Sequence, residues 1–333
     1  MMQIGKKVKA INTPSKFIDN KLVVIAGKWI KVAAVHDEDW LEGPVIDNPE
    51  LFISKLKESE LKADIFTFAQ KIPNCKPRYK FNMEWDNVAA IPITTYQDWW
   101  KKVSSDMRKD VKRAEKRGII IKEVEFSDEI VQGVIEINND TPIRQGRHFV
   151  HYGKDFETVK KEYSTYLDRS EFIGAYCKNE LVAIIKMVYV GELACFMEIL
   201  SKTKHNDKRP TNALIAKAVE ICEKKRKSYL TYGKYYYGNK QKSSFVDFKR
   251  RNGFERILFP RYYVPLTVKG RISIKLKLQL GLLGILPGTL ISILVNLRSY
   301  LYQKIVTRGE SSERRERQIQ DEKMTEMEGG NKT

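Results

Sequence analysis

The stretch from Glu171 to Phe254 decides the fold of this chain. It begins EFIGAYCKNELVAIIKMVYVGELACFMEILSK (residues 171–202). β-Branched and aromatic residues fill three segments of this run, and Lys178-Asn179 and Gly191-Glu192 separate them. Apolar segments of this length with short polar or glycine breaks predict three consecutive strands joined by tight turns.

A basic loop and a helix follow, in KTKHNDKRPTNALIAKAVEICEKKRK (residues 202–227). The apolar residues between 214 and 222 recur at helical spacing, and Pro210 suits a first helical turn because no N–H bond is lost there. The segment SYLTYGKYYYG (228–238) then predicts a further strand, and SSFVDFKRRNG (243–253) predicts a second helix with Gly253 as its C-cap.

This order of elements resembles the acyl-CoA-binding half of GNAT acetyltransferases. The ending FKRRNGF resembles that of the Fem-type (FemAB-like) peptidyl- and N-acyltransferases, which often end Phe-Lys-x-x-x-Gly-Phe, matched here by Phe248, Lys249, Gly253 and Phe254. The resemblance covers residues 98–268. It implies an α/β (α+β) fold with a GNAT-like mixed, mostly antiparallel sheet flanked by helices.

Four parts of the chain are predicted. Residues 1–97 form a reduced N-terminal α/β domain, with a hairpin at 21–35, a helix near 49–59, a strand at 63–70 and a strand ending at Ile93. Residues 98–268 form the GNAT-like acyltransferase domain. Residues 269–305 form a hydrophobic or amphipathic helical segment. Residues 306–333 are charged, contain few large apolar residues and are predicted to be disordered.

Residues 95–118 predict one amphipathic helix with a narrow apolar stripe and a basic outer face. Between Lys101 and Arg117 there are eight basic and three acidic residues. This face is either an ordinary solvated surface or a basic ridge for RNA or lipid. It carries no aromatic residues, which disfavours stacking with single-stranded RNA.

The resemblance implies a coenzyme A pyrophosphate site at the start of the 210–224 helix, where free N–H groups and the helix dipole favour an anion. The family's loop is Gln/Arg-x-x-Gly-x-Gly/Ala, and Thr211 stands here in place of its middle glycine. The predicted donor is acetyl-CoA or another acyl-CoA, with aminoacyl-tRNA as the alternative. The predicted cofactor-binding residues are Lys208, Arg209, Thr211, Asn212 and Ala213.

The loop TPIRQGRHFVHYGKD (141–155) has an unusual composition, and in GNAT folds the equivalent segment lines the acceptor site. It is either a substrate-contacting loop or an ordinary exposed one. Arginines there suit a carboxylate or phosphate, and His151 or His148 suits a base near neutral pH. The predicted substrate-binding residues are Arg144, Gln145, Arg147, His148, Tyr152, Tyr232 and Lys249.

The family often places a glutamate on the fourth strand to take the amine's proton, and Glu198 occupies that place among apolar residues. The alternative is a glutamate that points to solvent. The family also often uses a tyrosine near the following helix to protonate the leaving thiolate. Tyr236 is the candidate, although Tyr235 and Tyr237 qualify equally and all three could be a plain aromatic cluster.

Net charge is +18 over 333 residues, which favours an anionic partner such as coenzyme A, tRNA or an anionic membrane surface. The four histidines are scattered and do not form a zinc-binding motif, so no metal is predicted. No apolar run opens the chain, so we expect a cytoplasmic protein. Between Lys277 and Arg298 lie twenty uncharged residues interrupted by Pro287-Gly288. Basic residues flank them, which favours shallow peripheral attachment to the inner face of a membrane, with packing on the core as the alternative.

The sequence therefore predicts an acyltransferase that moves an acetyl or aminoacyl group to the amine of a small or cell-envelope-type acceptor. The alternative is a non-catalytic GNAT-fold module that binds RNA or an anionic membrane surface.

Overall fold

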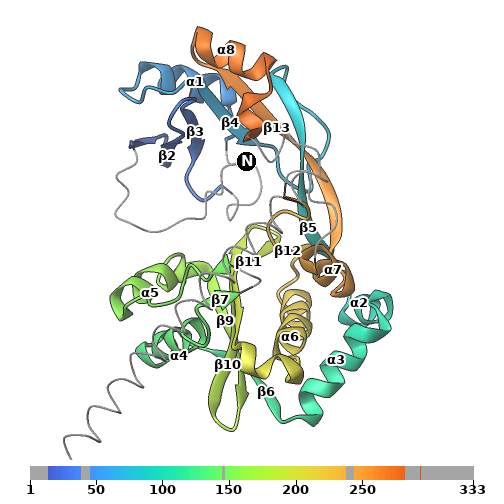
Figure 1. The fold of residues 1–333 in the computed structure, drawn as a ribbon. Helices are drawn as coiled ribbons and strands as arrows, with labels where there is room; N and C mark the ends of the chain where they lie inside the picture. The colour runs from blue at the N-terminus through green and yellow to red at the C-terminus, as the bar shows by residue number, and fades with distance from the viewer. Residues whose placement is uncertain (1–13, 39–45, 145–146, 238–243, 282–292, 294–333) are drawn as a thin grey trace, which may run out of the picture.

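The computed structural model describes residues 14–38, 46–144, 147–237, 244–281 and 293 (Figure 1). Eleven strands in these ranges form one sheet, mostly antiparallel. In spatial order they are β1 (Ser15–Ile18), β2 (Lys21–Ala26), β3 (Val32–Val35), β4 (Ile65–Ala69), β13 (Glu255–Pro265), β5 (Asn82–Pro92), β12 (Tyr229–Thr231), β11 (Leu193–Ser201), β10 (Glu180–Val190), β9 (Ser170–Cys177) and β6 (Ile119–Val124). Two short strands, β7 (Ile143–Arg144) and β8 (Arg147–His148), pair separately.

The helices of the same ranges flank this sheet. They are α1 (Pro49–Glu58), α2 (Tyr96–Lys102), α3 (Ser105–Lys116), α4 (Asp128–Asn138), α5 (Phe156–Tyr163), α6 (Pro210–Lys224), α7 (Ser244–Arg251) and α8 (Val268–Lys275). The mixed α/β, GNAT-like fold class predicted from the sequence is confirmed by this arrangement and by the structural comparisons below.

The three strands predicted from residue 171 are confirmed as the antiparallel run β9–β10–β11. Lys178 and Asn179, which join the first two, both have positive φ, at 50° and 66°. Two consecutive left-handed residues fit the right-handed twist of a two-residue hairpin. Gly191, with φ 54°, turns the chain between β10 and β11.

β11 and β12 run parallel, and their pairing is short. It joins residues 193–195 to 229–231, after which β12 ends and β11 continues to Ser201. Beyond the pairing, Glu198 lies opposite Lys186 of β10, whereas Phe196 lies opposite Met187, so Met197 is an extra residue in β11. This β-bulge leaves Met197 outside the regular ladder and changes the direction of the strand. The sheet therefore splits next to Glu198.

Side chains alternate between two cores because successive strand residues point to opposite faces. On β9, Ile173 and Ala175 join the core under α3 and α6. The neighbouring residue Phe172 points to the opposite face and joins the core under α4 and α5. Figure 1 shows α6 and α3 on one side of these strands and α4 and α5 on the other.

Strands from the N-terminal and C-terminal halves of the chain alternate in the middle of the sheet. β5 pairs with β12, and β13 pairs with both β5 and β4. The strands β1–β4 thus extend the same sheet, although their aromatic-rich core under α1 is a separate cluster. The predicted hairpin at 21–35 and the helix from Pro49 are confirmed. A domain boundary at residue 97 stays a prediction, and the sheet is continuous across it.

The prediction of one helix over residues 95–118 is wrong, because the chain forms α2 and α3 with a break at Val103-Ser104. Both residues have extended ψ values, 155° and 151°. The Ser104 hydroxyl accepts a hydrogen bond from the Met107 N–H (3.1 Å), and so begins α3 as its N-cap. The apolar stripe continues through the break, so the spacing of apolar residues alone could not reveal it.

The C-terminal region is described only as far as Gly281, with Ile293 beyond it. None of the helices within the described ranges combines the length and apolarity needed to span a bilayer. Most of the predicted helical segment at 269–305, and the whole predicted disordered tail at 306–333, lie outside the described residues.

Candidate functional site

Glu198 lies on β11 directly after the Met197 bulge, where the sheet splits. Its side chain is half-buried, and its carboxylate makes no hydrogen bond to any residue in the described part of the chain. Burial, and after it the nearby Glu162, raise the pKa of Glu198 to about 7, although Lys154 and Lys186 act in the opposite direction. A carboxylate with this pKa is divided between its acid and base forms near neutral pH, which suits a proton acceptor.

Two buried groups beside Glu198 were missed by sequence reasoning. The Lys186 ammonium donates to the carbonyl oxygens of Tyr163 (2.8 Å) and Thr165 (2.5 Å), and burial lowers its pKa to about 8. The Tyr163 hydroxyl is fully buried without a hydrogen-bond partner in the described ranges, and burial together with Glu198 raises its pKa. A lone lysine inside the apolar run IIKMV was the only sequence signal for either.

The predicted base His151 lies in the same region but is a weak base. The Lys154 ammonium binds both carboxylate oxygens of Glu162 (2.5 Å each) and lies 3.0 Å from His151 Nδ1. Because an ammonium only donates, His151 Nδ1 accepts this bond. Burial, with Lys154 and then Arg144, lowers the pKa of His151 to about 4. Because of this low pKa, the His151 imidazole binds a proton only weakly at neutral pH.

The remaining predicted residues of the 141–155 loop separate into two groups. Arg144 faces inward, where it donates to the Ile137 carbonyl (2.6 Å) and stacks 3.8 Å from the Phe149 ring centre. Its Nε is buried without a partner among the described residues. Arg147 and His148 are exposed on β8, and the Tyr152 ring lies 6.4 Å from that of His148. Gln145 lies outside the described residues.

Tyr232 directly follows β12, and the charge of Glu198 affects its hydroxyl. Its ring meets Phe196 of β11 edge-on at 5.7 Å, and burial, Tyr237 and Glu198 together raise the pKa of its hydroxyl. The predicted acid Tyr236 instead meets Tyr235 edge-on (5.0 Å). The guanidinium of Arg256 lies 5.0 Å from the Tyr236 ring centre. The hydroxyl of Tyr232 therefore shares the electrostatic environment of Glu198.

Lys249 is fully buried beneath the loop that follows β12. Its ammonium donates to the carbonyl oxygens of Tyr232 (2.7 Å) and Lys234 (2.6 Å) and lies over the rings of Phe245 and Tyr232. Burial lowers its pKa to about 7. Lys249 thus holds the loop that carries Tyr232, because both of its hydrogen bonds go to backbone carbonyls of that loop.

The loop predicted to bind pyrophosphate lies against α3. The Lys208 ammonium contacts Cys177 Sγ (3.2 Å) and His205 Nδ1 (3.1 Å). Arg209 has a left-handed backbone (φ 58°) and its Nε lies 3.3 Å from the Asp110 carboxylate. The Asn212 amide donates to Asn252 (3.2 Å), Thr211 is half-buried and Ala213 is buried. The Arg209 guanidinium is therefore already paired with a carboxylate of the protein itself, that of Asp110.

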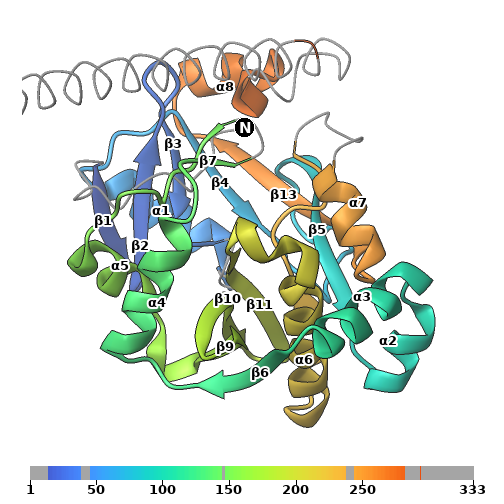
Figure 2. The same cartoon turned by 60° about the horizontal axis from the view of Figure 1, so that its bottom comes forward.

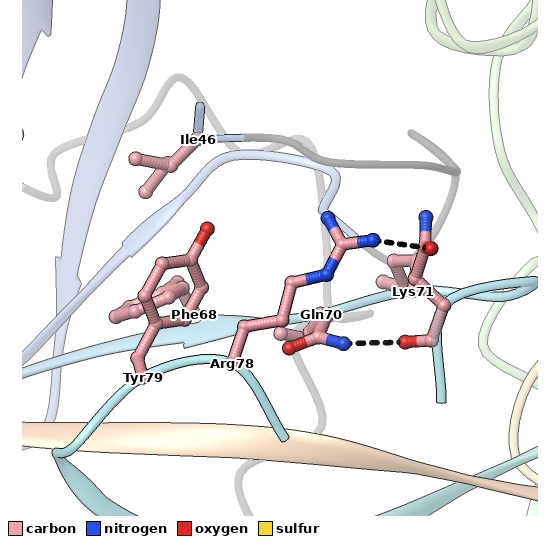
Figure 3. Close-up of a pocket in the computed structure, with 8 residues that line it drawn as sticks. Ile46, Phe68, Gln70, Lys71, Arg78 and Tyr79 are labelled. Atoms are coloured by element: carbon pink, nitrogen blue, oxygen red, sulfur yellow. Dashed lines mark hydrogen bonds between the residues drawn. The ribbon is translucent and has the colours of Figure 1, made fainter. Parts of the chain in front are cut away.

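A small hollow lies elsewhere, between β4 and the segment before β5 (Figure 3). The amide of Gln70 donates to the Asn74 carbonyl (2.7 Å), and the Arg78 guanidinium donates to the Asn74 side chain (2.5 Å). Its lining is Ile46, Phe68, Ala69, Gln70, Lys71, Asn74, Arg78 and Tyr79. It contains none of the residues predicted from sequence to form the site.

The raised pKa of Glu198 predicts how stability depends on pH. The folded pKa, about 7, exceeds the usual value of 4.5, so ionisation of Glu198 destabilises the fold as pH rises from about 4.5 through 7. We expect Glu198→Gln to gain roughly 2–3 kcal/mol of unfolding free energy relative to the wild type between pH 5 and pH 8. Urea melts at both pH values measure this, with Glu123→Gln, an exposed glutamate on β6, as the control. An equal gain in the control would refute the assignment.

Known proteins resemble this chain in structure but not in sequence. No protein-family model matches the sequence, and no curated protein is similar to it in sequence. The crystal structure of FemX matches with a TM-score of 0.55 at 9% identity, over 77% of this chain and 86% of FemX. The C-terminal domain (DUF2156) of a putative lysylphosphatidylglycerol synthetase from Agrobacterium fabrum matches with a TM-score of 0.50 at 11% identity, over 80% of this chain and 89% of that domain. The predicted likeness to Fem-type, GNAT-fold proteins is confirmed at the level of the fold.

Proposed function

We propose that this protein is an acyltransferase that moves an acyl group from an activated ester or thioester to an amine. The observation that carries the proposal is Glu198, a half-buried carboxylate without a hydrogen-bond partner in the described residues, whose pKa is raised to about 7 at the split of a GNAT-like sheet. A structural glutamate is normally paired or exposed, and this one is neither.

The residues around the split fit the steps of this reaction. The amine nitrogen attacks the carbonyl carbon, a C–N bond forms, and the amine proton passes to the Glu198 carboxylate. The carbonyl oxygen becomes an oxyanion, for which backbone N–H groups at the Met197 bulge are suitable donors. The C–S or C–O bond to the leaving group then breaks. Tyr232, kept protonated by its raised pKa, is our candidate for returning a proton to that group.

The donor is acetyl-CoA, another acyl-CoA or an aminoacyl-tRNA, and two observations favour the tRNA. Asp110 already contacts Arg209 at the loop where a coenzyme A pyrophosphate is expected. The outward face of α3 carries the exposed cations Lys109, Lys112 and Lys116, which suit a phosphate backbone. A similar domain is named for lysylphosphatidylglycerol synthesis. By analogy, the proposed acceptor is the amine of a cell-envelope precursor or of a small molecule.

The basic face of α3 also supports a second candidate function, a non-catalytic module that binds RNA. α3 presents this face without aromatic residues, so binding would rest on phosphate contacts and fall steeply with salt. Turnover with any donor separates the two functions, because the binding module has none.

A thermal melt with acetyl-CoA, coenzyme A or bulk tRNA tests the donor. A ligand that binds only the folded chain at a hundredfold excess over its Kd adds about 2.7 kcal/mol, which raises Tm by roughly 5 °C. We expect a rise with tRNA that is lost at high salt and in the variant Lys112→Glu/Lys116→Glu, and kept in the control Lys161→Glu on α5. A rise with both coenzyme A forms and none with tRNA would establish a thioester donor. No rise with any ligand contradicts the proposed function.

A further inference from the structure

Helix α8 presents its apolar side to solvent. Val268, Ile272 and Leu276 are 71%, 53% and 61% exposed, whereas Gly270 and Ser273 face the protein and are buried. A surface helix of a globular protein normally does the reverse and buries its apolar stripe against the core. Exposed apolar side chains gathered on one helix face mark a surface that binds something.

This orientation is fixed by close packing against Asp64. A Cβ on Gly270 would lie 1.9 Å from the Asp64 carbonyl oxygen, so only glycine fits there. The Thr267 hydroxyl accepts from the Gly270 N–H (3.0 Å) and donates to the Asp64 carboxylate (3.0 Å). The helix is therefore held with its apolar residues outward, and rotation to bury them would break these contacts.

The turn between β2 and β3 lies beside α8 and adds the most exposed large apolar residue of the described ranges, Trp29, at 86%. The Lys269 ammonium donates to the Trp29 carbonyl, and the Asp64 carboxylate accepts from the Lys31 N–H (2.9 Å). Asp64 thus joins the turn to the helix. We call Trp29, Val268, Ile272 and Leu276 the α8 surface.

The charged residues of the two segments that form the α8 surface all have one sign. Neither residues 27–31 nor residues 268–281 contain an aspartate or glutamate. The exposed basic residues of these two segments are Lys28, Lys31, Lys269, Arg271, Lys275 and Lys277. Two of them have acidic neighbours, Lys269 with Asp64 and Lys277 with Glu84. An apolar surface surrounded by cations complements a plane of anionic headgroups over hydrocarbon, and it repels a symmetric second copy of itself.

We propose that the α8 surface docks on an anionic lipid bilayer, with Trp29 and the three aliphatic residues entering the interface and the surrounding cations contacting headgroups. Tryptophan favours this interface because its ring is apolar and its N–H is polar. The sequence placed membrane attachment in residues 269–305, and the structure adds the turn at 27–31. Figures 1 and 2 both show α8 at the end of the molecule opposite β6. The proposal is independent of catalysis.

Co-sedimentation of the full chain with vesicles tests this proposal. We expect binding to vesicles of phosphatidylcholine with phosphatidylglycerol, little binding to phosphatidylcholine alone, and release at 0.5 M salt. Trp29→Ser and Ile272→Ser should each weaken partitioning roughly ten-fold. The matched control is Phe17→Ser, which removes a 69% exposed aromatic residue on β1 and should change partitioning less than about two-fold.

The side chains of Trp29, Ile272 and Phe17 are all exposed, so each variant should keep the wild-type melting curve. Equal binding by Trp29→Ser, Ile272→Ser and the wild type would overturn the proposal, as would failure of the wild type to bind anionic vesicles. Self-association that Trp29→Ser abolishes would overturn it in favour of a second copy. Tryptophan emission offers a third check, from the difference between the wild type and Trp29→Phe. If the Trp29 emission is protected from acrylamide quenching without vesicles, the membrane proposal is overturned. A segment of the same chain then covers the α8 surface.

Discussion

Glu198→Gln should lower kcat by about 10²- to 10⁴-fold while leaving the Kd of the donor unchanged. The amide has almost the shape of the carboxylate but cannot take a proton, so the amine stays a poor nucleophile. Wild-type kcat should rise with pH through about 7 and then level off, because the Glu198 carboxylate is the reactive form. The variant should lose this rise. Single-turnover kinetics with the donor found in the melts, and with a series of amine acceptors, measure both effects.

The control for this experiment is Glu123→Gln, which changes an exposed glutamate on β6 that pairs with Lys217 (3.2 Å). It should turn over at the wild-type rate. A loss in Glu198→Gln shared equally between kcat and donor affinity would point to a structural glutamate. An unaltered pH profile in that variant would assign the titration to another group. Tyr232→Phe tests the proposed acid in the same assay, and Tyr236→Phe is its control.

Arg261→Ala should destabilise the fold by about 3–5 kcal/mol, the usual cost of removing one partner from a buried ion network. Arg261 of β13 donates to Asp86 of β5 (2.8 Å) and to Glu38 after β3 (2.7 Å). Lys234, from the loop after β12, binds the same Asp86 carboxylate (2.6 Å). All of these side chains are at most 20% exposed. The loss leaves the carboxylates of Glu38 and Asp86 buried, and among the described residues Lys234 is the cation that remains bonded to Asp86.

Urea unfolding at pH 7 measures this effect, and Arg256→Ala supplies the control from the same strand. Arg256 is exposed and stacks on Tyr236, so its loss should cost about 0.5–1 kcal/mol. Burial opposes the charged form of Asp86, yet Lys234 and Arg261 hold its pKa well below its usual value. Its contribution should therefore be present above pH 4 and fade as pH falls below that. Similar losses in the two arginine variants would show that the network adds nothing beyond surface contacts.

The arrangement of strands in the C-terminal half could be predicted because its signals are local. Lys178-Asn179 and Gly191 place the hairpin turns, and Pro210 places the start of α6, since each depends on a few neighbouring φ angles and N–H groups. The break between α2 and α3 could not be predicted in the same way. The apolar stripe runs through it, and only the hydrogen bond of Ser104 to Met107 shows which of two compatible local structures forms.

The candidate site shows the same division. Glu198 was predicted from its place on the strand, but its raised pKa comes from burial and from Glu162 on α5, a separate part of the chain. His151 was predicted as a base because histidine usually titrates near neutral pH. Lys154, Arg144 and burial make it a weaker one, and only the folded chain brings them together.

The sequence by itself thus determined the strand order of the meander, the helix that follows it and the basic character of the surface, because turns, caps and charge act over short distances. Tertiary structure decided the rest. It brought β13 between β4 and β5, placed Tyr232 rather than Tyr236 beside Glu198, and turned the apolar face of α8 outward against Asp64. These features depend on contacts between residues far apart in the chain, whose energies no local pattern records.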